Sequence, residues 1–184
     1  MTNVEPDIRN ELTALLPNLR AFSNSLTRNR DLADDLVQET LIKAWKNQDR
    51  FIPGSNLKAW LFTILRNTYL THLRRRKFEA EDVNGELVQQ LSVEASQGAH
   101  MDLIDFSEAL ARLPREQREA ILLVGAEGFS HEDAALMCGC AVGTMKSRVN
   151  RARNKLSEIL GLQDADGGES SSLSATITQH LVQP

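Results

Sequence analysis

Residues 130–156, SHEDAALMCGCAVGTMKSRVNRARNKL, predict a helix, a tight turn and a second, basic helix. Ser130 can cap the first helix, and Asp133 follows three residues later, as in a capping box. The sequence Cys138-Gly139-Cys140 supplies the turn, because glycine accepts the backbone angles of a sharp reversal. The pattern therefore predicts a helix–turn–helix.

The second helix of this motif has one apolar and one polar face. Its apolar positions recur at helical spacing, at Val142, Met145, Val149, Ala152, Leu156 and Leu160. The polar face carries Ser147, Asn150, Arg151 and Asn154, and it is flanked by Lys146, Arg148, Arg153 and Lys155. A helix that enters a DNA major groove needs this arrangement, because its centre contacts base edges and its cations hold phosphates. The pattern favours DNA binding over the alternative, a solvated amphipathic helix packed on a small domain.

Charge is segregated along the 184-residue chain, although the net charge is only −4. Residues 66–77 hold five cations and no acid, and residues 145–157 hold five more cations and no acid. Residues 78–111 hold eight acids and no Lys or Arg. This pattern predicts two basic surfaces separated by an acidic connector, which is either simply solvated or shields the basic surfaces in the free protein.

Several classes of protein are disfavoured by the sequence. Acids at positions 5, 7 and 11 stand where a secretory signal needs an apolar core, and the longest apolar run is too short to span a bilayer, so we expect a cytoplasmic protein with no membrane contact. The two cysteines, Cys138 and Cys140, are too close for an unstrained disulfide, and with His131 they make a poor metal set. We expect no metal and no cofactor. No nucleophile–base set is evident, so we expect no enzymatic activity.

Two helices are predicted in the first quarter of the chain. The first spans about residues 7–28, with a kink at Pro17 or a division into two shorter helices. The second is DLADDLVQETLIKAW, residues 31–45, in which Asp31 can cap the helix and Trp45 belongs to the core side. Its polar positions are Asp34, Asp35, Gln38 and Glu39. Such acids either stabilise the helix start or form a docking surface for a protein partner, and the residues alone do not decide between the two.

A loop at residues 48–56, in which Ser55 or Asn56 can cap the next helix, leads into LKAWLFTILRNTYLTHLRRRK, residues 57–77. The first half of this helix is apolar nearly all round, which indicates burial. In the second half Asn67, Thr71 and Arg74 share one face, with Tyr69 and His72 among them and Arg75 and Arg76 following. Cations interleaved with aromatic and amide groups favour contact with unpaired bases over a basic helix end that merely complements its own dipole.

The chain is predicted to be all-α, with two small helical domains. The first domain comprises residues 7–78, and an acidic flexible linker follows at 79–101. The second domain, residues 102–160, starts with a helix at Asp102 that ends at Leu113-Pro114. A helix over 115–126 follows, with Pro114 as a possible first residue, and then comes the helix–turn–helix. Residues 161–184 form a flexible tail.

Three ordered motifs resemble the extracytoplasmic-function (ECF, group 4) sigma factors of bacterial RNA polymerase. DLADDLVQETLIKAW is similar to region 2.2 of that family, and NLKAWLFTILRNTYLTHLRRRK is similar to regions 2.3 to 2.4. The stretch from ALARLPREQREAILL to KSRVNRARNKL is similar to region 4. The details LKAWLFTILRN, REQREAILLVGAEGFS and CGCAVGTMKSRVNRAR resemble the general-stress-response EcfG subgroup of alphaproteobacteria.

The resemblance implies a sigma factor that binds the RNA polymerase core and directs promoter-specific initiation of stress-response genes. The core-binding residues would be Asp34, Asp35, Gln38 and Glu39, on the β′ clamp helices, with a further contact between the second domain and the β flap. Contacts with the opened −10 element would come from Asn67, at a flipped-out base, and from Thr71, Arg74, Arg75 and Arg76. Contacts with the −35 duplex would come from Thr144, Lys146, Ser147, Arg148, Asn150, Arg151 and Arg153. An anti-sigma factor of the NepR type is the implied inhibitor.

Two residues depart from frequent choices in that family. Ala141 replaces a Ser and so removes a helix cap worth about 1 kcal/mol. Asn150 stands where an aromatic or another residue is frequent. Two rival interpretations remain, a free-standing helix–turn–helix regulator and a sigma-like decoy for an anti-sigma factor. The 31–45 motif argues against the first, and the intact basic helices argue against the second.

Overall fold

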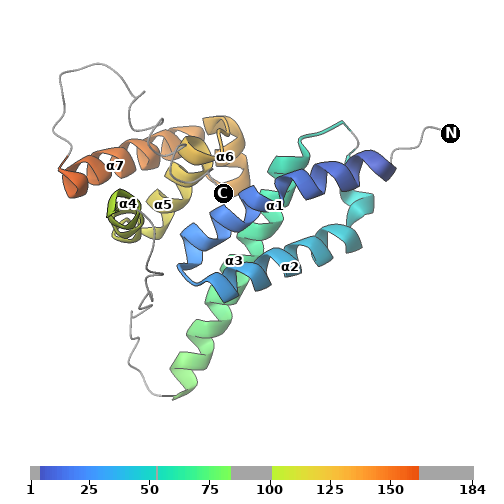
Figure 1. Cartoon of the computed structure of the whole chain (residues 1–184), viewed down its shortest axis with the longest axis horizontal. Helices are drawn as coiled ribbons and strands as arrows, with labels where there is room; N and C mark the ends of the chain where they lie inside the picture. The colour runs from blue at the N-terminus through green and yellow to red at the C-terminus, as the bar shows by residue number, and fades with distance from the viewer. Residues whose placement is uncertain (1–4, 53, 84–100, 162–184) are drawn as a thin grey trace. The chain divides into compact units, whose positions relative to one another are not determined.

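The structure, a computed structural model, describes residues 5–52, 54–83 and 101–161, and every regular element among them is a helix (Figure 1). The chain divides into two compact units, Met1–Val93 and Glu94–Pro184. The predicted all-α fold with two small helical domains is therefore confirmed. Most of the predicted acidic linker and all but Gly161 of the predicted tail lie outside the described residues.

The first unit is built from three long helices, α1 (Glu5–Thr27), α2 (Arg30–Lys46) and α3 (Leu57–Val83), with a short 3-10 helix η1 (Gln48–Arg50) after α2. Its core is apolar, and the rings of Phe22 and Phe62 lie 5.1 Å apart between α1 and α3. Burial of each large apolar side chain contributes about 1.5–3 kcal/mol. The fully buried large side chains of this unit are Leu19, Phe22, Leu36, Leu61, Phe62 and Leu65.

Asparagine side chains cap both α2 and α3. The Asn29 side chain accepts a hydrogen bond from the Leu32 N–H at 2.9 Å, so the predicted Asp31 cap is wrong and α2 begins one residue earlier, at Arg30. Asn29 is the cap because its backbone is extended, as a capping residue requires, whereas Asp31 already lies inside the helix. Of the two candidates for α3, Asn56 is the cap, because its Oδ1 accepts from the Ala59 N–H at 3.0 Å.

The proline inside α1 does not divide it. Pro17 lies within a single helix from Glu5 to Thr27, so the predicted alternative of two shorter helices is wrong. Pro17 is exposed, so the helical hydrogen bond that a proline cannot donate is missing on the solvent side of α1, where water can compensate for it.

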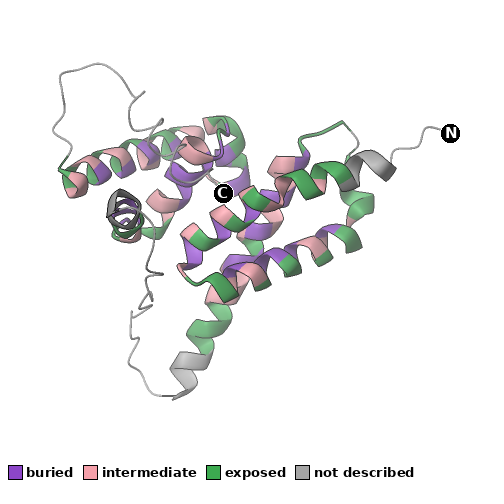
Figure 2. Ribbon diagram, viewed as in Figure 1, coloured by how far each residue is buried: buried purple, intermediate pink, exposed green. Residues whose placement is uncertain are grey.

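The end of α3 also differs from the prediction. The helix continues past Lys77 to Val83, through residues predicted as linker. Residues 78–83, FEAEDV, contain neither Gly nor Pro, so their acidic composition suggested a linker without supplying a helix stop. Figure 1 shows this part of α3 projecting beyond α1 and α2, and Figure 2 shows the preceding turn of α3, up to Phe78, as exposed.

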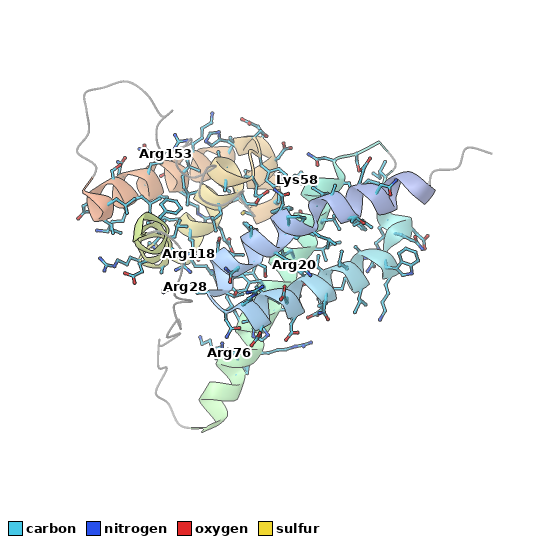
Figure 3. The ribbon with its side chains drawn as sticks, in the orientation of Figure 1. Arg20, Arg28, Lys58, Arg76, Arg118 and Arg153 are labelled. Atoms are coloured by element: carbon cyan, nitrogen blue, oxygen red, sulfur yellow. The ribbon has the colours of Figure 1, made fainter. Side chains whose placement is uncertain are left out.

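The second unit comprises α4 (Met101–Ala111), α5 (Arg115–Ile121), a π-helical turn η2 (Leu122–Ala126), α6 (His131–Cys138) and α7 (Val142–Leu160). Arg118, labelled in Figure 3, donates to the Ala111 carbonyl at 2.8 Å and to the Leu113 carbonyl at 3.1 Å, and so fixes the end of α4 against α5. The core consists mainly of Phe106, Leu110, Ile121, Leu122, Leu123, Met145, Val149 and Leu156.

The predicted single helix over 115–126 is only partly right. The regular helix stops at Ile121, and the Glu127 N–H then reaches back five residues to the Leu122 carbonyl at 3.0 Å, which defines the π turn. Pro114 is the cap of α5 and not its first residue, because its ψ of 144° is extended.

Candidate nucleic-acid and protein-binding surfaces

The helix–turn–helix has the capping and the turn that the sequence predicts. The Ser130 Oγ accepts from the Asp133 N–H at 3.0 Å and donates to the Asp133 carboxylate at 2.8 Å. Gly139 ends α6 with φ 64° and ψ 40°, the left-handed region that glycine adopts without strain. The Cys140 N–H donates to the Ala135 carbonyl at 3.0 Å, which closes the turn. The orientation of α7 relative to α6 is therefore fixed by local bonds.

Helix α7 buries one face and leaves the other open. Met145, Val149, Ala152 and Leu156 are buried, as predicted. The predicted DNA-contacting residues divide into two groups by exposure. Thr144, Lys146, Asn150 and Arg151 are exposed, whereas Ser147, Arg148 and Arg153 are half-buried.

Two cations of α7 are partly engaged by the protein. The Arg153 Nε is buried and has no hydrogen-bond partner within the described structure, so only the rest of its guanidinium is available outward (Figure 3). The charge of Arg148 acts on Glu116 of α5, whose pKa is lowered mainly by its own backbone N–H, and further by Arg115 at 2.8 Å and by Arg148. The exposed residues of α7 therefore form the most accessible part of its polar face.

Helix α3 carries the second predicted nucleic-acid surface. Asn67 is exposed, and Thr71 is half-buried, with its Oγ1 donating to the Asn67 carbonyl at 2.9 Å. Arg74, Arg75 and Arg76 are exposed on the projecting part of the helix, where Figure 3 labels Arg76. These cations leave a strongly positive helix segment open to an anionic ligand.

The predicted place of Tyr69 on that surface is wrong. It is buried, and its hydroxyl donates to the Leu26 carbonyl at 3.3 Å, so the ring packs against α1 and cannot stack on a base. Its place in the sequence between Asn67 and Thr71 suggested membership of the basic surface, but Tyr69 lies on the side of α3 that packs against α1. Tyr69 instead anchors α3 to the end of α1.

The outer face of α2 combines polar and apolar side chains. Asp35, Gln38 and Glu39 are exposed. Asp34 already forms an ion pair, because its carboxylate lies 3.3 Å from the Arg20 Nε of α1. Glu39 pairs with Lys43 at 2.8 Å, and the Lys43 Nζ also donates to the Thr68 Oγ1 of α3 at 3.0 Å. The lysine therefore holds one side of this face against α3.

Two large apolar residues lie exposed on the same side of α2. Ile42 is 55% exposed and Trp45 is 56% exposed, so the prediction of Trp45 as a core residue is wrong. The spacing could have shown this, because Ile42 and Trp45 follow Gln38 by four and seven residues and so share its face. Exposed acids and an amide around apolar side chains are typical of a protein interface with a polar rim.

The described residues show neither a metal site nor a membrane span. None of the His, Cys, Asp and Glu side chains that the structure describes gather in groups of three that could hold a metal ion. Neither Cys138 nor Cys140 forms a disulfide, and both are half-buried. Among the described helices, none is both long and apolar enough to cross a bilayer.

Comparison with known proteins connects both units to one family. Residues 12–79 match Sigma-70 region 2, and residues 103–156 match Sigma-70 region 4. The chain is 55% identical over 159 residues to the ECF RNA polymerase sigma factor EcfG of Rhodopseudomonas palustris, covering 86% of this chain and 88% of that protein. It is 38% identical over 126 residues to the ECF RNA polymerase sigma factor SigC of Mycobacterium tuberculosis, covering 67% and 68% of the two chains.

A solved structure gives the same assignment. The sigma factor RpoE of Bartonella quintana, in complex with the anti-sigma factor NepR, matches with a TM-score of 0.78 and 54% identity, covering 85% of this chain and 98% of that chain. The resemblance inferred from the sequence motifs is therefore confirmed at the level of sequence and of fold.

Proposed function

This chain belongs to the ECF sigma factors, in the EcfG-like subgroup, and acts in promoter-specific transcription initiation; on that premise we propose how its surfaces divide the task. The open face of α7 binds the −35 element as duplex, through Thr144, Lys146, Ser147, Arg148, Asn150, Arg151 and Arg153. The exposed face of α3 binds the opened −10 element, through Asn67, Thr71, Arg74, Arg75 and Arg76. The function needs no active site, because the polymerase core makes the RNA.

The observation that carries this proposal is the presence of two differently built basic surfaces on one chain. Helix α7 is amphipathic and buries one whole face, so a single exposed strip is offered, as suits insertion into a major groove. Helix α3 is buried in its first half and projects in its second, where amide and cationic side chains lie together. Amide and cationic groups on a projecting helix suit bases that have left the stack, whose unstacking costs a few kcal/mol.

The outer face of α2 is the proposed docking surface for the polymerase core. Its polar members are Asp34, Asp35, Gln38 and Glu39, and Ile42 and Trp45 supply apolar area that the polar residues alone lack. Asp34 contributes least, because its pair with Arg20 must be shared or broken on binding. The proposed partner surface is the pair of β′ clamp helices, with a second contact between the region 4 unit and the β flap.

Regulation follows from the subgroup. The matched RpoE was solved in complex with NepR, and we propose a NepR-like anti-sigma factor as the inhibitor of this chain. The target genes would be those of the general stress response, and the site of action would be the cytoplasm. Failure of the chain to bind any NepR-like protein of its own genome would refute the proposed inhibitor.

The test is in vitro transcription with core polymerase on a genomic fragment library, scored by transcript start sites. The wild type should start transcripts at specific promoters, and a complete lack of them would refute the function. Two variants then separate the surfaces. Asn67→Ala should impair promoter opening while core binding stays nearly unchanged, and Gln38→Ala should weaken core binding. Equal loss of core binding in Asn67→Ala would show that Asn67 is structural.

A further inference from the structure

Phe78 is an exposed aromatic residue in the projecting part of α3. It follows Lys77 directly, at the point where the sequence alone suggested a linker, and 69% of its surface is exposed. A single exposed apolar side chain is ordinary on protein surfaces and carries no argument by itself. The position of Phe78 on the helix gives it significance.

Continuation of α3 to Val83 places Phe78 in line with the base-contacting residues. An α-helix turns about 100° per residue, so a residue eleven positions after Asn67 lies within about 20° of it around the axis. Thr71 and Arg74 lie between them on the same stripe, four and seven residues after Asn67. The stripe is therefore one turn longer than the sequence predicts, and it ends in an aromatic ring.

Charge on this stripe indicates the ligand. Arg74 and Arg75 precede Phe78 by four and three residues and flank it on the side of Asn67, whereas Glu81 and Asp82 follow it by three and four residues on the other side, so an anionic ligand would reach the ring from the side of the two arginines. Both are exposed, and among the side chains that the structure describes, which in α3 end at Phe78, neither forms an ion pair with a carboxylate. An apolar partner would leave these two cations desolvated, which is unfavourable. A nucleic-acid strand satisfies both requirements, since phosphates pair with guanidinium groups and the flat face of a base covers an aromatic ring.

We propose that Phe78 stacks on an exposed base face of the promoter DNA. This rests on the proposed contact of Asn67 with an unpaired base. Eleven residues of helix span about 16 Å, and stacked bases rise about 3.4 Å per strand. For a strand that runs along α3 with its bases stacked, the base at Phe78 would lie about five steps from the base at Asn67. It is either a further unpaired base or the last base pair where the duplex ends.

Binding of promoter probes by the complex of core polymerase with the full chain tests this inference. Three probes share one promoter sequence: an intact duplex kept closed at low temperature, a fork with the duplex ending five steps from the Asn67 base, and a bubble unpaired on both sides of that point. Three variants distinguish the effect of the aromatic ring from that of apolar volume. Phe78→Ala removes both, Phe78→Leu keeps the apolar volume without a ring, and Phe78→Tyr keeps the ring. Circular dichroism and core affinity confirm that each variant folds and docks.

We expect Phe78→Ala and Phe78→Leu to bind the fork or the bubble roughly 5- to 100-fold more weakly than the wild type, the range that loss of one stacked base predicts. Phe78→Tyr should stay within about twofold, and the intact duplex should bind all variants alike. A loss confined to the fork identifies the terminal base pair, and a loss on the bubble identifies an unpaired base. Either result supports the inference.

Other outcomes overturn it. If Phe78→Leu binds like the wild type while Phe78→Ala is weak, the residue makes an apolar contact and not a stack. Equal losses on all three probes would mean that Phe78 is structural, and unchanged binding of every variant would mean that it does not touch DNA. If wild-type complex starts transcripts at promoters and Phe78→Ala binds both the fork and the bubble normally, this inference fails alone. If the wild type starts none, the proposed function fails first.

Discussion

Substitution of Ala141 by Ser should stabilise the region 4 unit by about 1 kcal/mol. Ala141 occupies the cap position of α7, and its side chain makes no hydrogen bond to the N–H groups of the first turn. The same unit contains a working cap for comparison. Ser130 at the start of α6 has φ −62° and ψ 158°, and Ala141 has φ −67° and ψ 147°. Because the two backbones are nearly alike, a Ser at position 141 should make the bond that Ser130 makes, here to the Thr144 N–H.

Amide hydrogen exchange is the appropriate assay, because both tryptophans, Trp45 and Trp60, lie in the first unit and fluorescence does not report on the second. A gain of 1 kcal/mol should slow exchange of the slowest amides in α7 about fivefold. It should also raise the melting temperature of a unit of this size by about 4–8 °C. Exchange in α1 to α3 of the same molecule is the internal control and should not change.

Two further substitutions serve as controls for this prediction. Ser130→Ala should cost about 1 kcal/mol, since it removes the cap that the structure shows. Ala141→Asp should stabilise α7 through its N-terminal dipole but weaken binding of −35 duplex, because it adds a negative charge beside Thr144 and Lys146. The reasoning is refuted if Ser130→Ala shows its cost while Ala141→Ser changes neither exchange nor melting.

Three other substitutions test the remaining surfaces. Arg28 holds a left-handed φ of 54° between α1 and α2, so Arg28→Gly should stabilise the first unit by about 1 kcal/mol in urea unfolding followed by tryptophan fluorescence; a loss of stability would show that contacts of the arginine outweigh the strain. Because the pKa of Glu116 is lowered in the fold, mainly by its own backbone N–H, its contribution is present above the unfolded pKa and is lost as pH falls through the folded value. Glu116→Gln should therefore flatten the decline in stability of the second unit below about pH 4.5, measured by exchange at several pH values. Trp45→Ala should leave folding nearly unchanged, because the ring is more than half exposed. It should weaken binding to the polymerase core about tenfold when the core is titrated with the variant. An unchanged affinity for the polymerase core would show that Trp45 is not part of the docking surface.

The sequence predicted the elements whose signals are local. Ser130 and Gly139 determine the start and end of α6 through their backbone angles and through local hydrogen bonds, so composition and spacing sufficed. The apolar face of α7 was predicted correctly for the same reason, because its residues recur at helical spacing on a helix with one buried side.

The errors arose where tertiary packing decides between two uses of the same residue. Aromatic residues were assigned by their neighbours in sequence, yet Tyr69 is buried against the Leu26 carbonyl and Trp45 is exposed. For Tyr69 the choice between core and surface depends on where α1 ends relative to α3, whereas for Trp45 the helical spacing from Gln38 already indicates the exposed face. The extension of α3 was missed because acidic residues resemble a linker in composition but are good helix formers.

Local charge, and not net charge, explains how a chain of net charge −4 can bind DNA. At physiological ionic strength the screening length is about 8 Å, so an acid more than one or two helix turns away cancels little of a cation's field. The cations of α7 from Lys146 to Arg153 lie in a stretch without acids, and so do the cations from Arg66 to Lys77, but Glu79, Glu81 and Asp82 follow the latter within about two helix turns. The surface of α7 therefore meets DNA as a basic one, and the surface of α3 is basic up to Lys77, where the acids begin. DNA affinity of each should fall steeply with added salt, with a slope set by the phosphates it contacts and not by the acidic remainder of the chain.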